Sequence, residues 1–116
     1  MLDDVHVNGR LTLGENIADL GGLTIAWEAL HEALAEDPAP VGGSTPQQRF
    51  FQAFAVMWRT NTTEAYARMV ARVDPHSPAR FRVNGPLANF PPFAALYDVP
   101  DGAPMTRPEE QRVRIW

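Results

Sequence analysis

Two carboxylates four residues apart, Glu15 and Asp19, stand near the start of a long amphipathic segment. On a helix, residues i and i+4 lie on one face, so both side chains would point the same way. Such a pair can supply one metal ligand and the acceptor that orients a ligating histidine. The alternative is structural: Glu15 would complete a capping box with Thr12, and Asp19 would be a solvated residue near a helix N-terminus. Spacing alone leaves both interpretations open.

Two glycines, Gly21 and Gly22, follow within one turn of Asp19. Each costs roughly 0.8–1 kcal/mol relative to alanine inside a helix. In the metal interpretation, they would let a second helix that carries histidines approach closely. The chain contains no cysteine, so any metal would have to be bound by His, Asp or Glu.

Apolar spacing and helix-breaking residues predict four helices, at about 13–36, 46–59, 63–73 and 90–97. The first should bury one stripe, formed by Ile17, Leu20, Leu23, Thr24, Trp27, Leu30 and Leu34. The second, which follows Thr45-Pro46, is apolar enough to be buried on more than one side. A short strand is possible at 5–7, and prolines make 74–78 irregular. The chain should therefore be mainly α, as one domain or a piece of a larger one.

Composition excludes several classes of protein. A net charge of −4 argues against nucleic acid as the main partner. No apolar run reaches the length of about 18 residues that a transmembrane helix needs, and the acidic start lacks the layout of a signal peptide. The absence of cysteine favours a bacterial source, whereas the compartment stays open because a signal or anchor would lie upstream.

A histidine between prolines, His76, lies in the irregular segment at 74–78. A side chain on such backbone is displayed rather than packed. Taken alone, a loop histidine of this kind is most simply a surface residue.

Four segments resemble the neprilysin family of zinc metallopeptidases, and they occur in the family's order. Residues 7–22 resemble its E-x-x-x-D segment, and residues 49–55 with Trp58 resemble its next helix. Residues 74–85 resemble its H-S-P-x-x-F-R segment, and residues 112–116 resemble its C-terminal sequence, which ends in tryptophan. The resemblance covers about residues 7 to 116.

This resemblance implies that 1–116 is the C-terminal helical portion of a thermolysin-like (gluzincin) catalytic domain. Glu15 would be the third zinc ligand, and Asp19 would orient a zinc-binding histidine. His76, which Asp74 would help to orient, would donate a hydrogen bond to the oxyanion. Arg82 would hold a backbone carbonyl of the substrate. The implied cofactor is one zinc ion, and the implied reaction is hydrolysis of short peptides by zinc-activated water.

One family motif, H-E-x-x-H, is missing from the chain. His31-Glu32 begins like it, but the second histidine is absent, and His31 is better interpreted as a surface or boundary residue. In the family, that motif lies upstream and supplies two zinc ligands and the general base. We therefore expect this chain alone to bind zinc weakly or not at all, to lack peptidase activity, and to need the upstream part as its partner.

The competing hypothesis is a non-catalytic helical binding module derived from the same family. In either case, the face carrying Ile17, Leu20 and Gly21 would lack its natural cover, and we expect self-association through this exposed apolar patch. The terminal Trp116 is expected to fill a groove, because leaving an indole in water is unfavourable.

Overall fold

The computed structural model describes residues 4–34 and 40–115. It contains α1 (Gly9–Ala33), α2 (Pro46–Met57), α3 (Glu64–Val73), α4 (Ala79–Ala88), α5 (Pro91–Leu96) and a short 3₁₀ helix η1 (Glu109–Gln111). These two ranges contain no strand, so the strand expected at 5–7 is wrong and the mainly α fold is confirmed. No helix within them is long and apolar enough to cross a membrane. Trp116, expected to fill a groove, lies outside the described residues.

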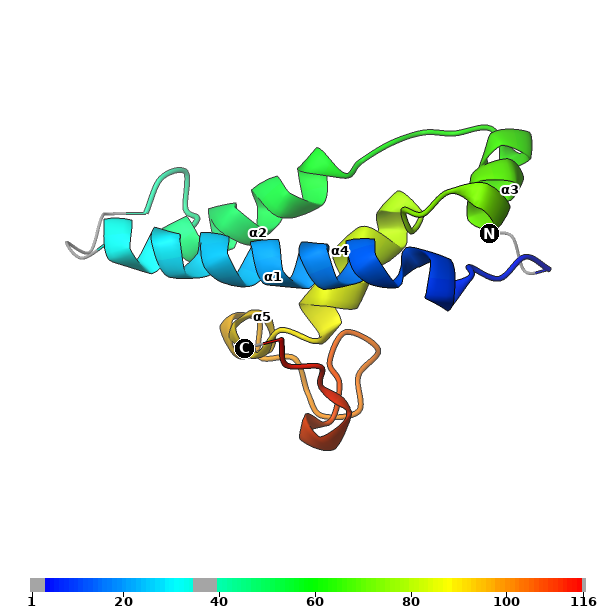
Figure 1. Ribbon diagram of the computed structural model, residues 1–116. Coiled ribbons are helices and arrows are strands. Elements are labelled where there is room, and N and C mark those ends of the chain that lie inside the picture. The colour runs from blue at the N-terminus through cyan, green and yellow to red at the C-terminus, as the bar shows by residue number, and fades with distance from the viewer. Residues whose placement is uncertain (1–3, 35–39, 116) are drawn as a thin grey trace.

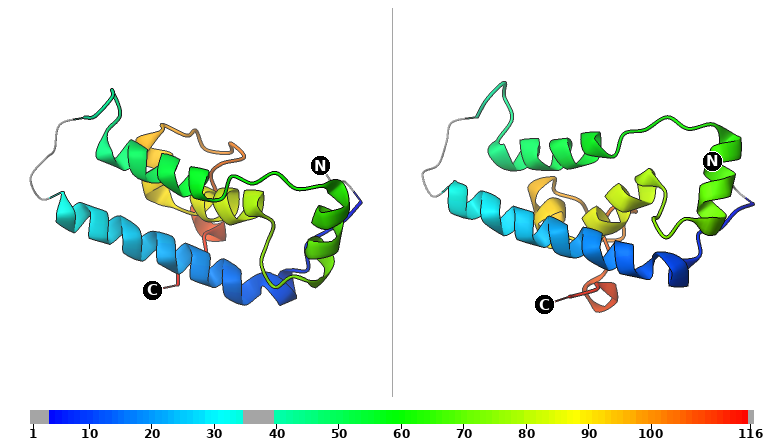
Figure 2. Two further views of the ribbon diagram at one scale, coloured as in Figure 1. Left: turned by 90° about the horizontal axis from the view of Figure 1, so that it is seen from above. Right: turned by 45° about the horizontal axis from the view of Figure 1, so that its top comes forward.

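The helices are arranged around α1, which forms one long rod (Figure 1). The two views in Figure 2 show α2 running antiparallel beside its C-terminal half. At the opposite end, α3 lies near the start of the chain, where Arg68 pairs with Asp4 at 2.7 Å. Helix α4 contacts α1 and leads into α5. This arrangement brings the beginning of α4 beside the first half of α1.

An aromatic core holds α1, α2 and the α4–α5 corner together. Trp27 of α1 stacks on Phe51 of α2 with ring centroids 4.8 Å apart, and Phe90 meets Trp27 edge-on at 5.9 Å. The buried members of this cluster are Leu23, Trp27, Phe51, Leu87 and Phe90. Because aromatic side chains bury large apolar areas, this cluster is the main hydrophobic anchor of the fold.

Helix α1 begins at Gly9, four residues earlier than the start predicted from Thr12 as the cap. The cap is Asn8, whose side chain accepts hydrogen bonds from the backbone N–H groups of Arg10 and Leu11. Asparagine is at least as good a cap as threonine, so the helix starts earlier. Thr12 lies inside it, almost fully buried. The capping box between Thr12 and Glu15 is therefore wrong, and Glu15 is free of that structural role.

The second helix is capped as its sequence indicates, but it is less buried than expected. Thr45 forms a full capping box with Gln48. Phe51 is 2% exposed, whereas Val56 and Met57 are 61% and 65% exposed. The expectation of burial on more than one side is wrong, because within the described chain nothing covers the outer face of the last turn.

Helix α4 was not predicted, because Gly85 and Pro86 lie inside it. A proline interrupts a helix by removing one hydrogen bond and crowding the preceding turn. Here Pro86 lies in the last turn, and both Pro86 and Leu87 are buried. Packing outweighs the local penalty, and the helix ends soon afterwards at Ala88, with Asn89 as its C-cap.

The side chain of Asn89 attaches the C-terminal segment to the end of α4 by two hydrogen bonds to the backbone of Val113. The amide of Asn89 donates to the carbonyl of Val113 and accepts from its N–H, both at 2.8 Å. Asn89 is 8% exposed, and a buried amide needs such partners. Residues 112–115 thereby line a small pocket together with Leu20 and Thr24 of α1.

The apolar patch expected on α1 is mostly covered. Leu20 is 9% exposed and Gly21 is buried, whereas Ile17 is 42% exposed. Leu20 lies in a groove of about 390 Å³ that α1 shares with α4 and the C-terminal segment. Two of the three residues are therefore not available for self-association.

Phe51→Ala should destabilise the chain by about 3–5 kcal/mol, because it removes a buried ring that contacts both α1 and α5. Urea unfolding followed by circular dichroism measures this change. The matched control Gln52→Ala, at an exposed position of the same helix, should stay within about 0.5 kcal/mol of the parent. Equal effects of the two substitutions would contradict the assigned core.

Candidate functional site

The centre of the candidate site is an ion pair between two helices. Arg82, in the first turn of α4, donates from Nε to Asp19 Oδ2 at 2.7 Å and from Nη2 to Asp19 Oδ1 at 2.5 Å. Side-chain exposure is 13% for Arg82 and 9% for Asp19. Hydrogen bonding to Asp19 raises the pKa of Arg82, against the opposing effect of burial. Two parallel charge-assisted bonds fix both the distance and the orientation of the pair.

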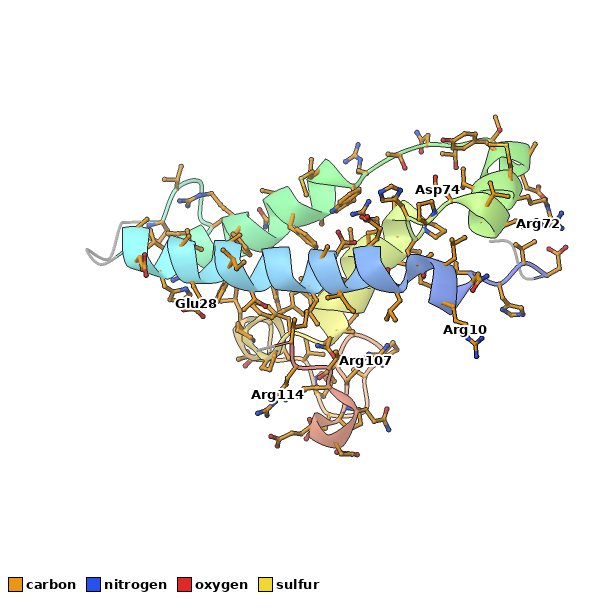
Figure 3. All side chains as sticks on the ribbon, viewed as in Figure 1. Arg10, Glu28, Arg72, Asp74, Arg107 and Arg114 are labelled. Atoms are coloured by element: carbon orange, nitrogen blue, oxygen red, sulfur yellow. The ribbon has the colours of Figure 1, made fainter. Side chains whose placement is uncertain are left out.

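His76 lies beside this pair, between two carboxylates. Its Nδ1 is 2.8 Å from Asp74 Oδ1, and its backbone N–H donates to the same oxygen at 2.8 Å. Its Nε2 is 3.3 Å from Glu15 Oε2, which is also 3.7 Å from Arg82 Nη2. Figure 3 shows Asp74 on the segment that leads into α4, above α1. Asp74 thus holds the imidazole at Nδ1, and the other ring nitrogen, Nε2, faces Glu15.

The turn that presents His76 lowers the pKa of Asp74. The hydrogen bond from the backbone N–H of His76 contributes most, and the bond from its ring contributes next. An aspartate that binds the N–H two residues later is a common turn device. It holds the loop in the conformation that displays His76.

A chain of polar contacts, missed by the sequence analysis, attaches this loop to α1. Ser77 Oγ donates to Asn16 Oδ1 at 2.7 Å, and Asn16 Nδ2 donates to Thr12 Oγ1 at 3.2 Å. Thr12 in turn donates to the carbonyl of Asn8 at 3.2 Å. Ser77 and Thr12 are 6% and 1% exposed. Ser77 directly follows His76 in the H-S-P-x-x-F-R segment. No spacing rule, however, pairs Ser77 with Asn16, which lies 61 positions earlier.

The five residues selected from the sequence, Glu15, Asp19, Asp74, His76 and Arg82, thus meet at one place. They come from α1, the 74–78 loop and α4. Glu15 and His76 side chains are 40% and 47% exposed, so a ligand can reach them. The arrangement brings an imidazole nitrogen and a guanidinium nitrogen within 3.3 Å and 3.7 Å of one carboxylate oxygen of Glu15.

As a metal site, the described residues are incomplete. Zinc in a hydrolase takes about three protein ligands, and the described part of the chain contains no group of three His, Cys, Asp or Glu that could hold a metal. Glu15, half-exposed and free of a capping role, fits as one oxygen ligand. Gly22 lies about one helical turn after Asp19. A Cβ atom added to Gly22 would meet no other described atom within 4 Å, so this side of α1 has room for a further element.

The carboxyl group of Asp74 should titrate below its ordinary pKa of 3.8, as carbon-13 NMR can measure. Its contribution to stability is present above the ordinary carboxyl pKa and is lost as the pH falls through the lowered value. In His76→Ala, the pKa should rise only part of the way, because the backbone N–H remains. A wild-type value at or above the ordinary pKa would contradict the described turn.

Comparison with known proteins places this geometry in a family. Residues 1–113 match the model of Peptidase family M13. The chain is 43% identical over 114 residues to human (Homo sapiens) endothelin-converting enzyme 1, covering 95% of this chain and 14% of that protein. It is 35% identical over 120 residues to neprilysin-21 of Caenorhabditis elegans, covering 97% of this chain and 15% of that protein.

The same similarity extends to solved structures. The zinc metalloprotease Zmp1 of Mycobacterium tuberculosis in its open state superposes with a TM-score of 0.91 at 44% identity, covering 99% of this chain and 19% of that one. Its complex with an inhibitor gives a TM-score of 0.92 at 43% identity, covering 99% and 18%. The chain thus spans about a seventh of the length of the curated relatives it matches. It belongs to peptidase family M13, the neprilysin family of metallopeptidases.

Proposed function

We propose that this chain works as the C-terminal part of a zinc metalloendopeptidase that cleaves short peptides. The observation that carries the proposal is that Glu15 Oε2 lies 3.3 Å from His76 Nε2 and 3.7 Å from Arg82 Nη2, beside the Asp19–Arg82 pair. Family membership supports the metallopeptidase class, and the names of the Zmp1 structures support zinc as the metal. The absence of cysteine and the similarity to Zmp1 support a bacterial source.

On the metal side, Glu15 supplies one carboxylate ligand. Asp19 is a positioning residue, since a carboxylate oxygen has two lone pairs and can accept from a ligating histidine as well as from Arg82. When bound, zinc supplies Lewis acidity and an activated water. The remaining ligands and the general base come from the upstream part of the protein.

On the substrate side, His76 and Arg82 act as hydrogen-bond donors. In its protonated form, which donates from both ring nitrogens, the imidazole gives Nδ1–H to Asp74 and presents Nε2–H to the oxyanion that forms at the scissile carbonyl. Arg82 uses Nε and Nη2 for Asp19, so Nη1 points its N–H groups at a backbone carbonyl of the peptide. Donors fixed before the substrate arrives need no reorganisation during the reaction, which is the source of their catalytic effect.

The isolated 116-residue chain should therefore be inactive. It contains neither the two H-E-x-x-H ligands nor the general base that this motif supplies. Its role is to complete a site whose other half lies in the rest of the polypeptide.

Glu15→Gln in the full-length protein should weaken zinc binding by at least about tenfold, because removing a first ligand or its partner has effects of this order. Zinc competition with a chromophoric chelator measures the affinity, and a fluorogenic peptide measures activity. Glu28→Gln, at an exposed position of the same helix, is the matched control and should change neither. Unaltered zinc affinity in Glu15→Gln, or peptidase activity of the purified 116-residue chain with added zinc, would contradict the proposal.

A further inference from the structure

The guanidinium of Arg82 is held on more than its Asp19 side. Its Cζ lies 3.9 Å from the centroid of the Trp58 ring. A cation over an indole face is attracted by the ring quadrupole, and tryptophan gives the strongest such contact among the aromatic residues. The indole therefore covers one face of the guanidinium while Asp19 binds one edge.

The position of the Trp58 ring beside Arg82 is fixed by helix α2. Trp58 is the C-cap residue of α2, seven positions after Phe51, so the helical repeat puts both on one side of the helix. Phe51 is 2% exposed and packs on Trp27 of α1. The same helix that is anchored in the core thus delivers Trp58 to the ion pair between α1 and α4.

The indole nitrogen gives an independent indication that the ring face is what matters. Trp58 Nε1 is buried and has no hydrogen-bond partner among the described residues. A buried N–H without an acceptor carries a desolvation cost that phenylalanine would avoid. A tryptophan is therefore explained here by what its π face provides, rather than by its own hydrogen bonding.

We propose that Trp58 is a positioning residue for Arg82, which sets the plane of the guanidinium so that Nη1 meets a peptide carbonyl edge-on. The inference rests on the proposed substrate role of Arg82. With one edge bound to Asp19 and one face against the indole, the guanidinium cannot rotate about its last bonds. The acceptor must approach in the plane of the group, along the edge that Nη1 presents.

The experiment uses the full-length zinc-loaded protein and a series of peptides in which one non-scissile carbonyl at a time is replaced by a thioamide, a weaker acceptor. The quantity measured is the ratio of kcat/KM for the oxo-peptide to that for its thioamide analogue. The wild type should discriminate at the carbonyl that Arg82 binds, and Arg82→Met, which has no hydrogen-bond donor in its side chain, should abolish that discrimination. Trp58→Leu should reduce the ratio about 3- to 10-fold, as expected for loss of a cation–π contact. Trp58→Phe should keep most of it.

The matched control is Phe50→Leu, an aromatic of the same helix that packs on Trp27 and does not contact Arg82 in the described structure. It should leave the ratio unchanged. An equal loss of kcat/KM for both peptides in Trp58→Leu would show a merely structural role and overturn the inference. If Trp58→Leu does not fold, tetrafluorotryptophan at position 58 keeps the shape and weakens the π face. An unchanged ratio in that protein would overturn the inference equally.

Failure of the underlying role of Arg82 gives a different result. In that case the wild type would discriminate at no position, or Arg82→Met would leave the discrimination intact. Either outcome would overturn the proposed substrate contact of Arg82 and, with it, the positioning role of Trp58. Discrimination that depends on Arg82 but not on Trp58 would overturn the inference alone.

Discussion

The bidentate pair between Asp19 and Arg82 is the constraint on which the arrangement of the site depends. Both side chains are nearly buried, at 9% and 13% exposure, so neither charge is stable there without the other. Breaking such a pair from one side typically costs 3–5 kcal/mol, because the remaining charge is left uncompensated. The pair therefore fixes α4 against α1, and α4 in turn fixes the loop that carries His76.

Two further sets of contacts support this pair from opposite directions. The Ser77–Asn16–Thr12 chain attaches the histidine loop to the start of α1, and Asp74 closes the turn itself. On the other side, the aromatic core holds α2, whose C-cap residue Trp58 covers the guanidinium of Arg82 with its indole ring. Polar contacts thus determine the orientation of the site residues, whereas apolar burial places the helices that carry them.

Local rules in the sequence predicted part of this structure. The i, i+4 spacing placed Glu15 and Asp19 on one face, and Thr45-Pro46 marked the start of α2. The same rules failed at Asn8, because a better cap stands four residues before Thr12. They also failed at α4, where Gly85 and Pro86 argue against a helix that burial of Pro86 and Leu87 stabilises.

The site could be predicted as a set of residues but not as a set of contacts. Family resemblance selected Glu15, Asp19, His76 and Arg82, and their catalytic and metal roles stay predictions. No periodicity connects Arg82 with Asp19, 63 positions apart, or with the ring of Trp58. These pairings depend on how the core brings three helices together, which a local pattern does not contain. The hydrogen bonds by which Asn16 connects Ser77 to Thr12 could not be predicted for the same reason.

A double-mutant cycle between Asp19→Ala and Arg82→Ala tests the central constraint most directly, with the free energy of unfolding measured in urea. Each single substitution should destabilise the protein by about 3 kcal/mol. The double substitution should cost at least about 1 kcal/mol less than the sum of the two single effects, because the second change removes a charge already without a partner. Additivity within about 0.5 kcal/mol would show that the two residues act independently. It would contradict the claim that their pairing fixes α4 on α1.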